Sequence, residues 1–172
     1  MTTMGLEVLR RELEGGARII QGLAAGVPAS DARVRPAPDA WSIVEVVAHL
    51  LDEEREDFRA RLDHVLHRPH ETWPRIDPAA WVTERGYNER DLAETLGAFL
   101  AERERSLAWL AGLAAPDWSR VYEASWGPIT AGDLAASWAA HDLLHIRQLV
   151  ELRRARLLTL TAPHSTTYAG DW

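Results

Sequence analysis

Residues 131–152, AGDLAASWAAHDLLHIRQLVEL, carry the pattern that decides the fold. Six positions follow one another in alternating steps of four and three residues: Leu134, Trp138, His141, His145, Gln148 and Leu152. This spacing predicts one inward stripe on an amphipathic helix. Two imidazoles and an amide therefore occupy positions where a helical core favours Leu or Ile. Burying such groups costs on the order of 1–3 kcal/mol each unless partners satisfy them.

Outward from this stretch, helical periodicity predicts four helices, over about residues 3–25, 42–69, 88–114 and 130–156. The second starts sharply, because Ser42 and Glu45 form a capping box. Thr130 and Asp133 form another box at the start of the fourth helix, and Asn88 is the expected N-cap of the third.

Four long helices without a convincing strand pattern predict an all-α fold, a four-helix bundle in a single domain over residues 1–172. The connections at 69–87 and 115–129 are longer than a helical hairpin needs. An extended chain of the first connection can reach about 60 Å. A crossover along the bundle is therefore feasible, and an up-down-up-down order is not assumed. The tail from Leu157 onward is expected to be a loop.

Composition excludes several kinds of chemistry. The chain has no cysteine, which rules out disulfides, a cysteine nucleophile and thiolate metal ligands. Its 19 basic and 26 acidic residues give a net charge of −7, which disfavours a nucleic-acid partner. The longest apolar run, at 108–115, is far shorter than the ~20 residues of a membrane span. With charged residues from Glu7 onward instead of a secretory signal, we expect a cytoplasmic protein with no membrane contact.

The polar positions of the inward stripe suggest a metal site. His141 and His145 are four residues apart, so both rings lie on one helix face within reach of a shared ion. His49, among apolar residues of the second helix, is the best candidate for a third ligand. Glu53, one turn further, could orient a ligand, act as a general base or be a fourth ligand. Gln148 could hydrogen-bond a ligand or the substrate.

Simpler interpretations stand beside this one. The histidines could be satisfied core residues without a metal. His64, His67 and His70 are expected to mark a solvated helix end, since Pro69 breaks the helix between the last two. The charge runs at 52–57 and 102–105 are expected to be solvated faces. Four tryptophans of the long connections either roof a pocket over the metal or anchor loops on the bundle: Trp73, Trp81, Trp118 and Trp126.

Two motifs together carry a family resemblance. WSIVEVVAHL at 41–50 and HDLLHIRQL at 141–149 resemble, in order and separation, the DinB/YfiT-like superfamily of metalloenzymes. The resemblance spans nearly the whole chain. It implies a four-helix bundle with a crossover connection and a divalent metal held by three histidines. Matched position by position, those ligands are His49, His141 and His145.

The resemblance also implies a reaction class. It points to a metal-dependent enzyme acting on a small molecule, either a thiol-dependent transferase that uses a low-molecular-weight thiol or a hydrolase. Zinc or nickel suits an all-nitrogen ligand set, and iron or manganese are alternatives. The thiol must come from a co-substrate, because the chain has no cysteine. A different class, a non-catalytic metal- or ligand-binding bundle with a role in stress, remains open, as does a homodimer. The sequence identifies no catalytic residue.

Overall fold

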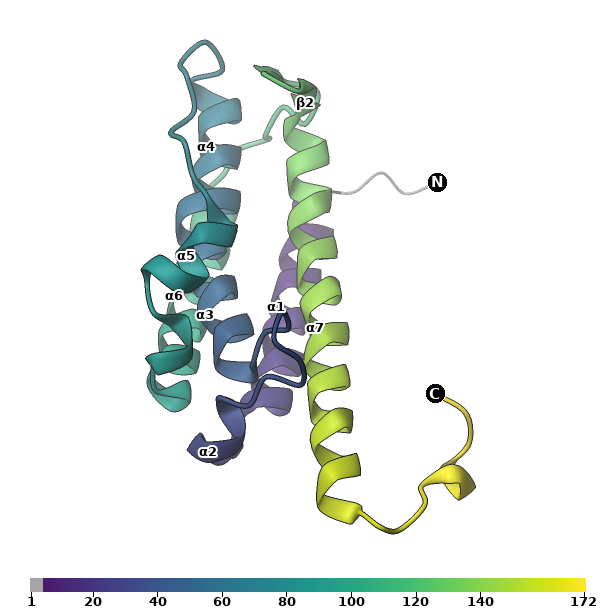
Figure 1. The fold of residues 1–172 in the computed structure, drawn as a ribbon. Coiled ribbons are helices and arrows are strands. Elements are labelled where there is room, and N and C mark those ends of the chain that lie inside the picture. Colours follow the sequence, from purple (N-terminus) through teal and green to yellow (C-terminus); the bar gives the residue numbers. More distant parts are fainter. Residues whose placement is uncertain (1–4) are drawn as a thin grey trace.

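The computed structural model describes residues 5–172, which form four long helical rods (Figure 1). Three of the rods are the single helices α1 (Leu6–Ala24), α6 (Leu92–Ala111) and α7 (Ala131–Thr161). The remaining rod has three consecutive parts: α3 (Ile43–Glu53), the π-helical turn η1 (Glu54–Phe58) and α4 (Arg59–His67). The predicted all-α four-helix bundle is confirmed.

Two clusters of buried side chains show how the rods run. One cluster joins the start of α1 and of α7 to the end of α4 and of α6, through Leu9, Leu62, Leu110 and Leu134. The other joins the opposite ends of the same rods, through Ile20, Val47, Leu96 and Leu149. The helices α1 and α7 therefore run in one direction, and α3–α4 and α6 run in the other (Figure 1).

The connection at 68–91 is a crossover, because it joins two rods that run in the same direction and must return along the bundle. It contains α5 (Pro78–Glu84) and the 3₁₀ turn η2 (Tyr87–Glu89). Trp81, Val82 and Tyr87 are buried against Ala48 of α3, so the connection packs on the bundle. The crossover that the sequence made feasible is confirmed.

The second long connection contains a β-hairpin that the sequence analysis did not predict. Strands β1 (Val121–Ala124) and β2 (Gly127–Thr130) pair antiparallel. Gly127 has a φ of 132°, a conformation that favours glycine at the turn. Four residues a strand are too few to give a periodic signal in the sequence.

Side-chain caps mark the start of three long helices, α3, α6 and α7. Both predicted capping boxes are present, at Ser42 and at Thr130. The prediction of Asn88 as the N-cap of α6 is wrong, since Asp91 accepts the Glu94 N–H there. Asn88 lies in η2 instead, and its side-chain oxygen accepts a hydrogen bond from Ser42 Oγ.

The end of α7 also differs from the prediction. The helix continues to Thr161, beyond the expected end at Arg156, so the first part of the predicted tail loop is helical. No helix-breaking residue precedes Pro163, and proline disfavours helical geometry in the residue before it. A 3₁₀ turn, η3 (Thr167–Ala169), follows.

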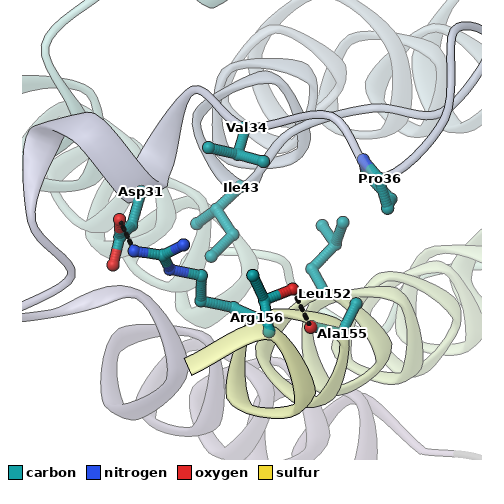
Figure 2. A pocket seen from close by; sticks show the side chains of 8 residues that line it. Asp31, Val34, Pro36, Ile43, Leu152, Ala155 and Arg156 are labelled. Carbon is teal, nitrogen blue, oxygen red and sulfur yellow. Dashed lines mark hydrogen bonds and ion pairs between the residues drawn. The ribbon is translucent and has the colours of Figure 1, made fainter. Parts of the chain in front are cut away.

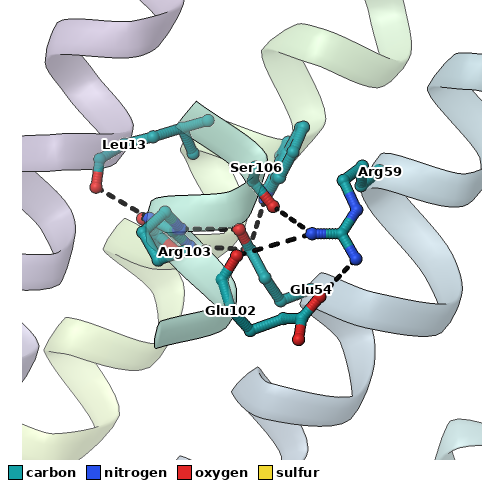
Figure 3. A network of polar contacts seen from close by, with 8 residues as sticks. Leu13, Glu54, Arg59, Glu102, Arg103 and Ser106 are labelled. Atoms are coloured by element: carbon teal, nitrogen blue, oxygen red, sulfur yellow. Dashed lines mark hydrogen bonds and ion pairs between the residues drawn. The ribbon is translucent and has the colours of Figure 1, made fainter. Parts of the chain in front are cut away.

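The two charge runs are buried in part, so the expected solvated faces are wrong for their buried members, whereas Arg55, Glu104 and Arg105 are exposed as predicted. Asp52, Glu54, Glu102 and Arg103 are all at most 3% exposed. Ion pairs between helices satisfy them, as Figure 3 shows for Arg59 with Glu102 and for Arg103 with Glu54. Such pairs form between segments far apart in sequence, so the pattern of one helix cannot reveal them.

The short helix α2 (Ala29–Ala32) fastens the loop before α3 to α7. Its Asp31 carboxylate lies 2.6 Å from the Arg156 guanidinium, at the rim of a small pocket (Figure 2). Across residues 5–172, no helix combines the length and the apolar character needed to cross a bilayer.

Replacement of the Ser42 cap tests the start of the helix that carries His49. Ser42 is fully buried, and its hydroxyl accepts the Glu45 N–H. We expect Ser42→Ala to lower the free energy of unfolding by about 1 kcal/mol, measured by urea denaturation. The exposed Ser30→Ala control should change it by less than about 0.5 kcal/mol. Equal effects of the two substitutions would contradict a capping role.

Candidate metal centre

The three histidines singled out by the sequence lie on two rods that pack against each other. His49 lies in the second turn of α3, and His141 and His145 lie one turn apart on α7. His49 is 6% exposed and His145 5% exposed, and His141 is half-buried. The side chains therefore meet inside the bundle.

The three rings converge through their Nε2 atoms. His141 Nε2 lies 3.3 Å from His49 Nε2 and 3.0 Å from His145 Nε2. One ring nitrogen from each residue lies within 4.8 Å of the other two. This convergence of three nitrogens from two helices is the geometry that a shared ion requires.

The environment keeps these rings neutral. Burial, and to a smaller extent the neighbouring His145, lower the pKa of His49 and of His141 to about 3. Burial also lowers the pKa of His145 itself. Neutral imidazole is the form that binds a metal, so the rings are ready to act as ligands at neutral pH.

Gln148 orients the ring of His145. Its Oε1 atom lies 2.8 Å from His145 Nδ1. An amide oxygen only accepts hydrogen bonds, so Nδ1 carries the proton and Nε2 keeps its lone pair. The buried Nδ1 of His49 has no hydrogen-bond partner among the described residues. At least one of the three neutral rings directs a free lone pair at the others. This arrangement suits a divalent cation better than hydrogen bonding among the rings.

Aromatic side chains surround the cluster and lower its polarity. The Trp41 ring lies 4.9 Å from that of His49, and it stacks parallel to that of His145 at 6.2 Å. The Phe58 ring lies 4.9 Å from the ring of His141. Water-poor surroundings strengthen every electrostatic interaction inside the site.

A groove of about 740 Å³ runs between the loop before α3 and the outer side of α7. Trp41, His145 and Gln148 belong to its lining, together with Arg147 and Leu144. Its volume falls in the range of small-molecule sites. The groove therefore reaches the edge of the histidine cluster at His145.

Glu53 does not join the ring nitrogens. The cluster among residues 5–172 consists of the three histidines, and the Glu53 side chain instead lies close to the Asp57 carboxylate. Burial and the nearby Asp57 carboxylate raise the pKa of Glu53, which favours its protonated form. The structure thus places Glu53 beside the acidic run of η1 and not as a fourth ligand.

The remaining candidates serve the fold. His64 is buried at the far end of the rod, with Nε2 2.8 Å from the Glu71 carbonyl oxygen, whereas His67 is exposed. The predicted solvated helix end is therefore wrong for His64. Of the connection tryptophans, Trp81 is buried beside Ala48 and Trp126 is 67% exposed. Trp73 and Trp118 pack on the buried cluster that contains Leu62 and Leu110. Loop anchoring therefore accounts for three of the four tryptophans.

Two features of the site were not predicted from the sequence, the aromatic wall at Trp41 and the buried ion group at Asp142. The Trp41 ring lies beside two of the three histidines, a contact that its place in the sequence motif does not reveal. Asp142, between the two histidines of α7, is 2% exposed and binds Arg103. The sequence signal for this ion pair is the carboxylate between the two histidines, because a buried carboxylate needs a positively charged partner such as Arg103.

Comparisons with known proteins agree with this fold and cluster, which define a helical bundle with a histidine site. A profile of the DinB superfamily matches residues 12–149, and the chain belongs to that superfamily. YfiT from Bacillus subtilis, described as a probable metal-dependent hydrolase with an unusual four-helix bundle topology, is a similar solved structure. The likeness covers 90% of this chain and 89% of YfiT, with a TM-score of 0.78 and 18% identity. No curated protein matches the chain by sequence.

The lowered histidine pKa values predict an acid-sensitive metal-free protein. In the unfolded chain histidines bind protons near pH 6.5, whereas His49 and His141 do so near pH 3 in the fold. The unfolded state binds more protons between these values. We therefore expect the free energy of unfolding to fall as the pH is lowered from about 6.5 to about 3. A His49→Gln, His141→Gln variant should show a shallower decline, and NMR titration midpoints near 6.5 would contradict the expectation.

Proposed function

We propose that this chain is a metal-dependent enzyme that acts on a small molecule and holds a divalent ion through His49, His141 and His145. The observation that carries the proposal is the convergence of three ring nitrogens, one from each residue, within 4.8 Å of one another inside the bundle. The family supports it, as does the description of YfiT as a probable metal-dependent hydrolase.

The residues of the site have distinct tasks in this proposal. The three imidazoles supply neutral nitrogen ligands and leave coordination positions open, as a catalytic ion requires. Gln148 holds the tautomer of His145. Trp41 and Phe58 exclude water from two sides. A bound divalent ion would polarise a substrate carbonyl and acidify a water or a thiol. Zinc or nickel suits this ligand set, with iron or manganese as alternatives.

Two reactions suit such a site, a hydrolysis and a transfer to or from a low-molecular-weight thiol. The thiol would enter from solution, because the chain contains no cysteine. The groove beside His145 has room for a small co-substrate. Cytoplasmic location and a homodimer stay predictions from the sequence.

Loss of single histidines tests the ligand set. We expect His141→Ala or His145→Ala to reduce the bound metal to near zero while the protein stays helical, because two imidazoles hold a divalent ion weakly. His49→Ala should weaken binding sharply. Metal analysis of protein prepared without a histidine tag measures this, and the exposed His70→Ala is the control that should retain full metal content. Retention of metal by all three site variants would reject the assignment.

Spectra of the cobalt-substituted protein distinguish the reaction classes. An open site should bind azide, and a thiol-dependent transferase should also bind small thiols with a new thiolate-to-cobalt absorption band. A hydrolase should show the azide effect and hydrolyse esters or amides in a substrate screen. An inert spectrum with every small ligand would favour the non-catalytic bundle instead.

A further inference from the structure

The guanidinium of Arg103 connects all four long rods. Arg103 belongs to α6 and is 2% exposed. It donates to both carboxylate oxygens of Glu54 in η1, at 2.8 and 2.9 Å, and to both of Asp142 in α7, at 2.6 and 2.9 Å. A further bond of 2.7 Å reaches the Leu13 carbonyl oxygen in α1 (Figure 3). All five N–H groups of the guanidinium are thereby used.

This ion group holds α7 at two points on either side of His141. Asp142 is the next residue in the chain, and Trp138, almost one turn earlier, donates its indole N–H to Glu54 Oε2 at 2.8 Å. Neighbouring residues of a helix are offset by about 100°. A fixed Asp142 therefore determines the direction in which the rings of His141 and His145 point.

The opposite side of Asp142 is closed by α1. A Cβ atom on Gly16 would lie 2.3 Å from Asp142 Oδ2, so only glycine permits this approach. The Asp142 carboxylate is confined between the α1 backbone and the guanidinium. Rotation of α7 in either direction would break a two-bond ion pair or create a clash.

We propose that Arg103 and Asp142 are positioning residues that set the rotation of α7, so that His141 and His145 face His49. The inference deepens the proposed function, because the same three histidines form the proposed metal site. Arg103 and Asp142 touch neither the ring nitrogens nor the groove. Their proposed route is the direction of the helix that carries two of the three ligands. The Arg103 charge also reaches His141 and lowers its pKa, and the charge-preserving glycine variants below separate the two effects.

The chain offers a matched control in Glu102. This carboxylate is as buried as Asp142, at 2% exposure, and pairs with Arg59 of α4 and with Arg105. Its partners are two arginines of the second rod and one of α6 itself. Among residues 5–172 it forms no ion pair with α7. Asp142→Asn and Glu102→Gln thus make the same chemical change at two buried carboxylates, only one of which pairs with a residue that holds α7.

Metal affinity of these two variants tests the proposal. Zinc binding is measured by competition with a chromophoric chelator, and the melting temperature of the metal-free protein reports stability. We expect Asp142→Asn to weaken zinc binding about tenfold or more, and Glu102→Gln to change it by less than about twofold at a similar loss of stability. Equal loss of affinity in both variants would overturn the proposal.

A second pair of variants keeps every charge. Gly16→Ala should displace Asp142 and weaken zinc binding in the same way. Gly15→Ala, whose added Cβ would meet nothing within 4 Å, should leave it unchanged. Unaltered affinity in Gly16→Ala, with a crystal structure that shows Asp142 displaced, would also overturn the positioning role.

A readout without metal separates this inference from the proposed function. The ring centroids of the three histidines lie 4.4 to 5.3 Å apart, close enough for contacts that can be measured without added metal. Proton NMR should detect through-space contacts between these rings in the wild type and in Glu102→Gln, and their loss in Asp142→Asn. A wild type that binds no metal would reject the proposed function, and the ring contacts would still decide the positioning role. Ring contacts retained in Asp142→Asn would refute it.

Discussion

Polar side chains at the centre of a helical bundle need partners inside the protein, and this requirement governs the contact between α3 and α7. The Arg103 guanidinium meets it completely, because each of its N–H groups has an acceptor. The histidine cluster does not, since its Nε2 atoms face one another and His49 Nδ1 has no partner among the described residues. The Arg103 group has all its hydrogen-bond partners, which supports a structural role. The histidine rings lack some of theirs, which supports a ligand there.

The features that could be predicted from sequence depend on local spacing or on caps. The steps of four and three along α7 predicted that His141 and His145 share a face, and their convergence with His49 is what the structure shows. The capping boxes at Ser42 and Thr130 are local in the same sense. The length of the connection at 68–91 was enough to make the crossover feasible, although not to require it.

The features that could not be predicted depend on contacts between distant segments. Glu54 and Arg103 resemble solvated residues in their own helices, and only the packing of α6 between two other rods makes their burial favourable. The π-helical turn at Glu54–Phe58 adds to this difficulty, because it changes the angular order of side chains that a regular helix would fix. The likeness to YfiT, at 18% identity, concerns the fold, so the chemistry has to be argued from these side chains.

The order of the four rods along the chain has a consequence for how the molecule folds. His49 and His141 are 92 residues apart, and α7, which closes the bundle against α1 and α3, follows every other long rod in the chain. During synthesis the first three rods therefore emerge from the ribosome without the fourth wall of the core. Contacts across such separations form late and slow the search for the native state. No partly folded chain that lacks α7 can hold all three imidazoles, so the centre is completed together with the bundle itself.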